Sequence, residues 1–192
     1  TRQRVDWQRQ AARDLAQGHV AAAVKAFDDH GALDWSATEA EARARLVARW
    51  TADTATDSAA TRFVFAYTNV EVDALNAELR AVRRARGELG ADVMFETKHG
   101  KADFAVGDRI QVTDTDRRLG LSNGAAGVIT AIDEGTGRIS ARLDAGAAGA
   151  GRVVTWLASE FEGFRHGYAG TIYKGQGKTL DFLAQELLRE VT

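Results

Sequence analysis

Apolar residues recur at helical spacing through the first third of the chain, and three amphipathic helices are predicted there. Their apolar positions are Trp7, Ala11 and Leu15, then Val20, Val24 and Phe27, and finally Ala40, Val47 and Trp50. Gly18 and Gly31 follow the first two segments, where glycine commonly ends a helix. Ser36 and Glu39 have the spacing of a capping box, which predicts the start of the third helix.

A strand followed by a helix is predicted after a polar loop at residues 51–60. Residues 62–67 are short, apolar and rich in aromatic side chains, which favours a buried strand. Thr68 and Glu71 form a second capping box, and the helix that it opens has Val72, Leu75, Leu79 and Val82 on its apolar face. Ligands of α/β sheets bind at the carboxyl ends of the strands, so Thr68 and Asn69 are predicted to lie at a functional edge.

The spacing of apolar residues changes after Gly90, where short predicted strands alternate with turn residues. The predicted strands span residues 104–112, 126–132, 138–143 and 153–156. Asn123-Gly124 and residues 135–137 supply the turns, and the Ala/Gly tract 145–151 a flexible connection. The pattern predicts a small β-barrel or meander. Residues 167–173 then read as a strand and residues 180–191 as a helix, so a β module interrupts an α/β domain.

Composition excludes only a few classes of protein. The chain has 192 residues with 45% hydrophobic content and a net charge of −2, so an anionic partner would require a local basic patch. It contains no cysteine and no apolar run long enough to span a membrane, and a cytoplasmic location is expected. It begins with Thr1 and contains no proline, which suggests a fragment of a longer protein.

Residues 171–179 resemble a phosphate-binding loop without meeting its requirements. Gly177-Lys178-Thr179 would need a glycine at position 172, and Ile172 stands there. A β-branched residue cannot replace the conformational freedom of that glycine. The pattern that remains is T-x-x-K-x-Q-G.

Four weaker patterns favour structural roles. Residues 120–124 match G-x-S-x-G around Ser122, but the adjoining Asn-Gly turn is unlike the strand-to-helix elbow of a hydrolase. Asp133-Glu134 precede a glycine turn, which indicates a hairpin tip rather than a metal site. The histidines lie far apart, so surface or capping roles are predicted. The arginines at 80, 83, 84 and 86 predict a solvated helix face, with contact to phosphate as the alternative.

The segment 171–177 resembles motif V of superfamily 1 helicases of the RecD-like branch, with Tyr173 where histidine is usual. Its flanks, residues 164–170 and 179–181, are closer still to the helicase half of TraA-type conjugative relaxases. Arg2-Gln3 resembles motif IV, and Thr68-Asn69 with Leu75-Asn76 resembles a T-N-x-x-x-x-x-L-N segment of the same family. Residues 104–129 look like the SH3-like module inserted in that domain.

The resemblance implies an α/β fold: a partial RecA-like domain, the second of the motor, with an inserted small SH3-like β-barrel. Residues 1–90 would form a helical segment and the first part of this domain. Residues 91–160 would form the inserted module, and residues 161–192 the return to the domain.

The resemblance also implies a parent protein that nicks a plasmid strand and unwinds DNA with ATP and Mg²⁺. Arg2 would be the catalytic, ATP-sensing residue. The implied DNA-binding residues are Thr68, Asn69, Thr171, Tyr173, Lys174, Gly175, Gln176, Gly177 and Lys178. Tyr168 and Phe104 are further candidates for stacking on bases, as is Tyr173, for which a core position is the alternative. Expected partners are single-stranded DNA and the remainder of the helicase/relaxase chain.

The chain departs from the family by having no P-loop, no acidic Walker B pair and no arginine-bearing motif VI. We therefore expect it to bind no cofactor and to hydrolyse no ATP by itself. A non-catalytic scaffold that keeps a helicase-like shape and binds nucleic acid or protein is the alternative.

Overall fold

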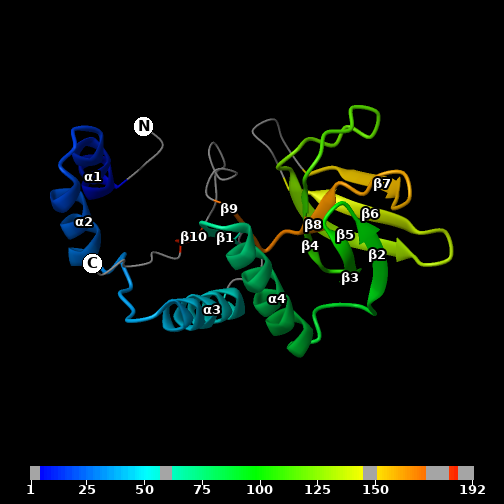
Figure 1. Cartoon of the computed structure of the whole chain (residues 1–192), viewed down its shortest axis with the longest axis horizontal. Helices are drawn as coiled ribbons and strands as arrows, with labels where there is room; N and C mark the ends of the chain where they lie inside the picture. The colour runs from blue at the N-terminus through cyan, green and yellow to red at the C-terminus, as the bar shows by residue number, and fades with distance from the viewer. Residues whose placement is uncertain (1–4, 57–61, 145–150, 172–181, 186–192) are drawn as a thin grey trace. The chain divides into compact units, whose positions relative to one another are not determined.

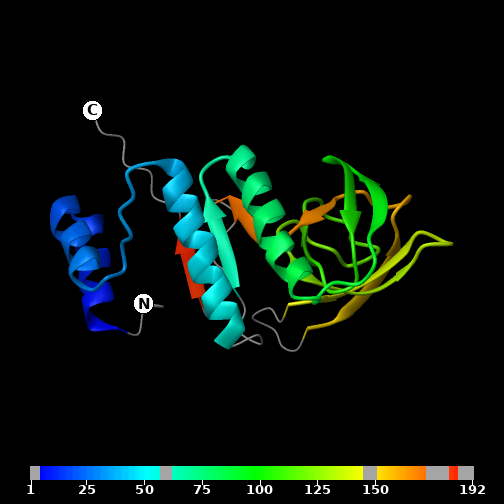
Figure 2. The ribbon, with the colours of Figure 1, turned by 90° about the horizontal axis from the view of Figure 1, so that it is seen from below.

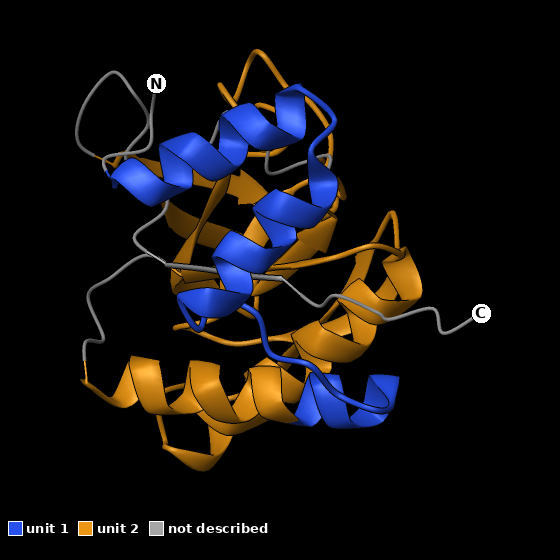
Figure 3. Ribbon diagram, turned by 90° about the vertical axis from the view of Figure 1, so that its left-hand side faces the viewer, with its two compact units in different colours: residues 1–44, 187–192 blue, residues 45–186 orange. Residues whose placement is uncertain are grey.

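The computed structural model describes residues 5–56, 62–144, 151–171 and 182–185, the last of these by their backbone alone. The Ala/Gly connection predicted at residues 145–151 lies outside the described residues except for Gly151. The chain divides into two compact units (Figure 3), one of residues 1–44 and 187–192 and one of residues 45–186. The larger unit contains every strand and the candidate functional residues that the structure describes.

The smaller unit contains a helical hairpin made of α1 (Asp6–Ala16) and α2 (Val20–Asp29). Gly18 has a φ of +81° in the turn, a conformation that glycine adopts without strain. Trp7 lies edge-on to Phe27, with 5.3 Å between ring centroids, and stacks on His30 at 4.1 Å. The two helices predicted for this region are therefore confirmed.

The third helix, α3 (Glu39–Thr56), begins with a different capping pair from the one predicted. The hydroxyl of Thr38 accepts a hydrogen bond from the Glu41 amide at 3.2 Å, and the Glu41 carboxylate accepts one from the Ala37 amide at 3.1 Å. The Ser36–Glu39 capping box is therefore wrong by two residues. The loop predicted from residue 51 is also wrong over its first part, because α3 continues to Thr56.

A three-stranded parallel sheet forms the α/β part of the larger unit (Figure 1). Its order is β10 (Phe182–Gln185), β1 (Arg62–Ala66) and β9 (Ala169–Thr171). Helix α4 (Asn69–Ala85) follows β1 directly, as predicted. The apolar core joins α3, α4 and the sheet (Figure 2) through Leu46, Trp50, Val64, Ala66, Val72, Leu75, Leu79, Tyr168 and Ala169.

The helix predicted at residues 180–191 is wrong where the structure describes it. Residues 182–185 form β10, which pairs in parallel with β1 in the register Arg62↔Phe182. The other residues of that predicted helix lie outside the described part of the chain. Pairing with an existing strand supplies hydrogen bonds that helical periodicity in the sequence does not reveal.

The β module contains two sheets. A hairpin of β2 (Val93–Thr97) and β3 (Gly100–Phe104) forms the smaller one. The larger has the order β7-β6-β5-β4-β8, and all its pairs are antiparallel. These strands are β4 (Arg109–Val112), β5 (Ala126–Asp133), β6 (Arg138–Leu143), β7 (Val153–Leu157) and β8 (Phe164–His166). Within the described residues the two sheets do not close into a barrel.

The predictions for this module are mostly confirmed. The strands at 126–132, 138–143 and 153–156 are present, as are both glycine turns, with φ of +85° at Gly124 and +68° at Gly137. The single strand predicted for residues 104–112 is wrong. A turn at Val106 and Gly107 divides β3 from β4, and Gly107 has a φ of +95°. The β2–β3 hairpin was not predicted.

Candidate nucleic-acid interface

Three of the predicted DNA-binding residues lie together at one edge of the parallel sheet. Strands β1 and β9 run in parallel with Ala66 opposite Thr171, so both strands end at the same level. Thr68 and Asn69 follow β1 after one intervening residue and are exposed, while Thr171 is half-buried. We call residues 67–69 with Thr171 the strand-end edge. Ligands of α/β sheets bind at such edges, outside the carboxyl ends of the strands.

The capping box of α4 fixes the backbone of this edge. Glu71 donates its amide to the Thr68 hydroxyl oxygen at 3.2 Å. In return the Glu71 carboxylate accepts hydrogen bonds from the amides of Tyr67 at 3.1 Å and Thr68 at 2.7 Å. The Thr68 hydroxyl retains its own proton as a donor, because a hydroxyl can donate and accept at once. A phosphate oxygen is a suitable acceptor for that proton.

The remaining predicted site residues lie outside the described part of the chain. They are Arg2, Tyr173, Lys174, Gly175, Gln176, Gly177 and Lys178. Their roles remain predictions.

Two predicted stacking residues are wrong, because both are buried. The side chain of Phe104 is fully buried in the core of the β module, and Tyr168 is 2% exposed. The exposed aromatic residue at the strand-end edge is instead Tyr67, with an exposed fraction of 70%. Its place immediately before Thr68-Asn69 was the available sequence signal. The pattern of residues 62–67 does not distinguish Tyr67, because it predicts a buried strand for all the aromatic residues there.

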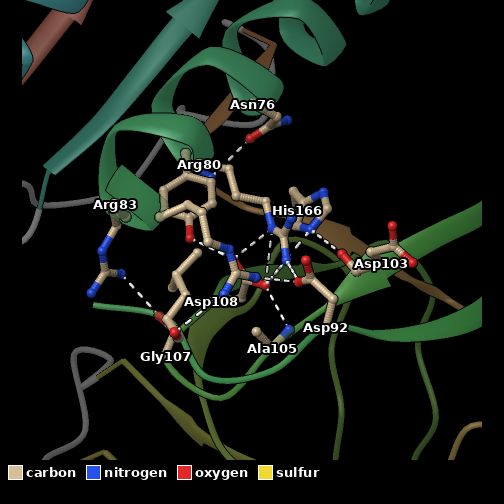
Figure 4. A network of polar contacts seen from close by, with 12 residues as sticks. Asn76, Arg80, Arg83, Asp92, Asp103, Ala105, Gly107, Asp108 and His166 are labelled. Atoms are coloured by element: carbon tan, nitrogen blue, oxygen red, sulfur yellow. Dashed lines mark hydrogen bonds and ion pairs between the residues drawn. The ribbon is translucent and has the colours of Figure 1, made fainter. Parts of the chain in front are cut away.

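A polar network joins α4 to the β module (Figure 4). The carboxylate of Asp108, which is fully buried, accepts hydrogen bonds from Arg80 at 3.0 and 3.1 Å. It also accepts one from the Tyr168 hydroxyl and one from the Ala105 amide, each at 2.7 Å. Burial raises the pKa of Tyr168, and the charge of Asp108 raises it further. The network satisfies a buried charge, which is otherwise costly.

The neighbouring arginines are also used within the fold. Arg83 donates to the Gly107 carbonyl at 2.9 Å, and Arg84 pairs with Asp92. Arg86 donates to the Thr51 carbonyl at 2.6 Å. The predicted solvated face is therefore wrong, and these side chains hold α4 to its surroundings instead. Their engagement also removes support for the alternative of phosphate contact.

A cleft of about 500 Å³ lies beside this network, between α4 and the β2–β3 hairpin. Its charged lining consists of Asp73, Arg80, Arg84, Asp92, Asp103 and Arg165. Since both signs are present, the cleft lacks the cationic character that single-stranded nucleic acids require. The strand-end edge is the better candidate interface.

His166 is the histidine whose predicted surface role is wrong. Its side chain is 18% exposed, and its Nε2 atom lies 3.0 Å from the Asp103 carbonyl. Burial lowers the pKa of His166, and the nearby charge of Arg80 adds to this against the opposing charge of Asp108. His30 has the predicted capping role, because its Nδ1 atom lies 2.7 Å from the Ala26 carbonyl near the end of α2.

The other weak patterns have the predicted structural roles. Asp133 is at a hairpin tip, where it accepts a 2.7 Å hydrogen bond from the Thr136 hydroxyl. Ser122 precedes the Asn123-Gly124 turn, and β5 follows instead of the helix that a nucleophile elbow needs. In the described ranges, no cluster of acidic and histidine side chains could hold a metal ion.

Sequence comparison supports the predicted family. A conjugal transfer protein TraA of Rhizobium radiobacter is 34% identical over 180 residues, which cover 94% of this chain and 16% of that protein. The chain is similar to one segment of TraA. The same extent of similarity holds for TraA of Agrobacterium fabrum, at 34%, and for a probable TraA of Sinorhizobium fredii, at 33%. The resemblance to TraA predicted from the motifs is thereby confirmed. The chain spans about one sixth of the length of these relatives.

Comparison of structures gives a looser likeness. A Pif1 helicase from Bacteroides, solved with ADP-AlF3 and single-stranded DNA, is 18% identical with a TM-score of 0.45, over 77% of this chain and 39% of that one. A second Pif1 structure, of two helicases coordinating at forked DNA, is 21% identical with a TM-score of 0.44, over 65% and 32%. Such scores are too low to establish function. No protein-family model matches the chain. None of the described helices is long and apolar enough to cross a membrane.

Proposed function

We propose that the chain is part of the second RecA-like motor domain of a TraA-type relaxase-helicase and contacts single-stranded DNA at its strand-end edge. The observation that carries this proposal is the parallel pairing of Ala66 with Thr171. That pairing brings Thr171, the first residue of the segment that resembles motif V, to the same edge of the sheet as Thr68-Asn69. The similarity to TraA over 94% of the chain supports the assignment.

The proposed contacts follow from the chemistry of the residues. Hydroxyl and amide groups of Thr68, Asn69 and Thr171 donate to phosphate oxygens, which position a strand without reading its sequence. Lys174 and Lys178, in the segment that follows β9, neutralise phosphates. The backbone of Gly175 and Gly177 approaches the strand, with Gln176 coupling DNA to nucleotide and Tyr173 stacking on a base.

The nucleotide chemistry is assigned to the rest of the parent protein. Arg2 would contact the γ-phosphate of an ATP bound, with Mg²⁺, by a P-loop in another part of that protein, and the ATP supplies the energy of unwinding. We also propose that residues 91–160 are an SH3-like insertion. The proposed boundaries of the domain around it are residues 1–90 and 161–192. Since we propose that the parent protein acts on plasmid DNA, we also propose that it is located in the cytoplasm.

Fluorescence anisotropy with a labelled oligo-dT tests the DNA contact. We expect the 192-residue chain to bind it, with log K falling by about 0.7 per phosphate contact for each decade of salt. Lys174→Ala should weaken binding and reduce that slope by about one contact. The matched control is Lys25→Ala, since Lys25 is an exposed lysine of α2 paired with Asp29.

Two results would contradict the proposal. The first is no binding at low salt, which would leave the scaffold alternative. The second is an equal effect of Lys174→Ala and Lys25→Ala, which would show that the segment after β9 does not touch the strand.

A further inference from the structure

Tyr67 is an exposed aromatic residue next to a strand whose own aromatic residues are buried. Its exposed fraction is 70%, whereas Phe63 and Phe65 on the preceding strand are 2% and 4% exposed. An apolar residue just before a helix cap usually packs on the fourth helical residue, which here is Val72. Val72 is instead fully buried in the core of the α/β part. Most of the surface of Tyr67 is nevertheless open to solvent.

The backbone that carries Tyr67 is nevertheless held firmly. Its amide donates to the Glu71 carboxylate at 3.1 Å, within the same capping box that fixes Thr68. No side-chain hydrogen bond or ring contact of Tyr67 occurs among the described residues. The ring is thus an exposed platform on a rigid support, which limits the entropy lost when a ligand stacks on it.

The surroundings of this platform suit a nucleobase. Tyr67 directly follows Ala66, whose partner across the sheet is Thr171. Tyr67 is therefore at the same end of the sheet as the proposed phosphate donors. Val70, in the first turn of α4, is a second apolar residue exposed near this edge, with an exposed fraction of 80%. The nearby charge of Glu71 is partly offset, because its carboxylate already accepts two backbone amides.

We propose that Tyr67 is a base-stacking site for single-stranded DNA, flanked by Val70. This inference rests on the proposed function, because it requires a strand on the edge. Stacking on an aromatic ring is tolerant of sequence, since every base has a π face. The site would therefore hold the strand during translocation without selecting a base.

Variants at position 67 give a direct test by anisotropy with oligo-dT. We expect Tyr67→Ala to weaken binding about five- to hundred-fold, as removal of a stacking residue does. Tyr67→Phe should bind like the unaltered chain, because the ring remains. The salt dependence of Tyr67→Ala should be unchanged, since no phosphate contact is lost, whereas Lys174→Ala reduces it.

An abasic oligonucleotide of the same length isolates the base. It has the same phosphates without the rings, so the unaltered chain and Tyr67→Ala should bind it equally. The thermal unfolding midpoint of Tyr67→Ala should match that of the unaltered chain, because the side chain is exposed. This measurement excludes a loss of folding as the cause of weak binding.

The outcomes separate the two proposals. Absence of any oligo-dT binding would overturn both. Binding that Lys174→Ala weakens and Tyr67→Ala does not would overturn the stacking site alone. A defect of Tyr67→Ala that persists on the abasic track would also overturn it, because the base would then play no part.

Discussion

At the scale of single residues, burial determines whether a side chain binds within the fold or remains accessible to a ligand. Tyr67 and Tyr168 both adjoin strands of the parallel sheet, yet one is 70% exposed and the other 2%. Tyr168 donates its hydroxyl to a buried carboxylate, whereas the ring of Tyr67 is available to a ligand. His166 shows the same effect on a titratable group, because burial lowers its pKa.

His166 should make stability depend on pH. Below the ordinary histidine pKa of about 6.5, the unfolded chain binds a proton that the folded chain resists, so the free energy of unfolding falls. Above that pH both states are neutral at this side chain and the contribution is absent. Urea unfolding at pH 7.5, 6.5 and 5.5 should show a smaller decline for His166→Gln than for the unaltered chain.

The matched control is His19→Gln, because His19 is exposed. It should leave the decline unchanged. If the two variants had the same pH profile, the lowered pKa of His166 would have no effect on stability.

At the scale of elements, the link between β8 and β9 lies in close backbone contact with β4. Gly167 lies between these strands and donates its amide to the Arg109 carbonyl at 2.9 Å. A Cβ atom at this position would lie 2.4 Å from the Ile110 carbonyl carbon and 2.5 Å from its oxygen. Both are backbone atoms of β4, so a change of side-chain rotamer cannot relieve the clash.

Gly167→Ala should therefore lower the free energy of unfolding by roughly 1–3 kcal/mol, the usual cost of overpacking. Urea denaturation measures this change. Gly135→Ala is the control, because its nearest contact would be a side-chain oxygen of Asp133 at 3.5 Å. A loss no larger than that of Gly135→Ala would show that β4 and β8 can separate without cost.

At the scale of the whole molecule, buried polar contacts join the β module to the α/β part of the larger unit. Asp108 in the module accepts hydrogen bonds from Arg80 on α4 and from Tyr168 beside β9. Asp92 supplies Arg80 with a second carboxylate. Burial lowers the pKa of Arg80, but the hydrogen bonds and charges of Asp108 and Asp92 together outweigh it and raise the pKa. We expect the two parts to unfold together because they share these contacts.

Asp108→Asn tests this coupling. It should lower the free energy of unfolding by about 3 kcal/mol, the lower end of the cost of breaking a buried pair, because Arg80 keeps Asp92. Hydrogen exchange followed by mass spectrometry should show faster exchange in α4 and β4 together. Asp114→Asn is the control, since its partner Lys98 is 62% exposed, and a change below about 1 kcal/mol is expected. Faster exchange in only one of the two elements would contradict the coupling.

The sequence by itself determined the elements with local signals and the resemblance to TraA. The capping box at Thr68 and Glu71, the Asn123-Gly124 turn and the helices of the first third each depend on neighbours a few residues away. The motif at residues 171–177, together with its flanks and the segments that resemble other helicase motifs, likewise predicted the resemblance to TraA. The roles of Arg2 and of residues 173–178 remain predictions.

Only the tertiary structure decided what depends on distant neighbours. Strand β10 forms because β1 offers it a parallel partner, and residues 182–185 are distant from β1 in sequence. Arg80, Arg83 and Arg84 bind carboxylates and a carbonyl in the chain that follows α4, whereas Arg86 binds the Thr51 carbonyl of α3. The exposure of Tyr67 beside the buried Phe63 and Phe65 is likewise a property of the folded chain. In each case the deciding interaction joins residues that local periodicity does not relate, which is why the sequence pattern could not reveal it.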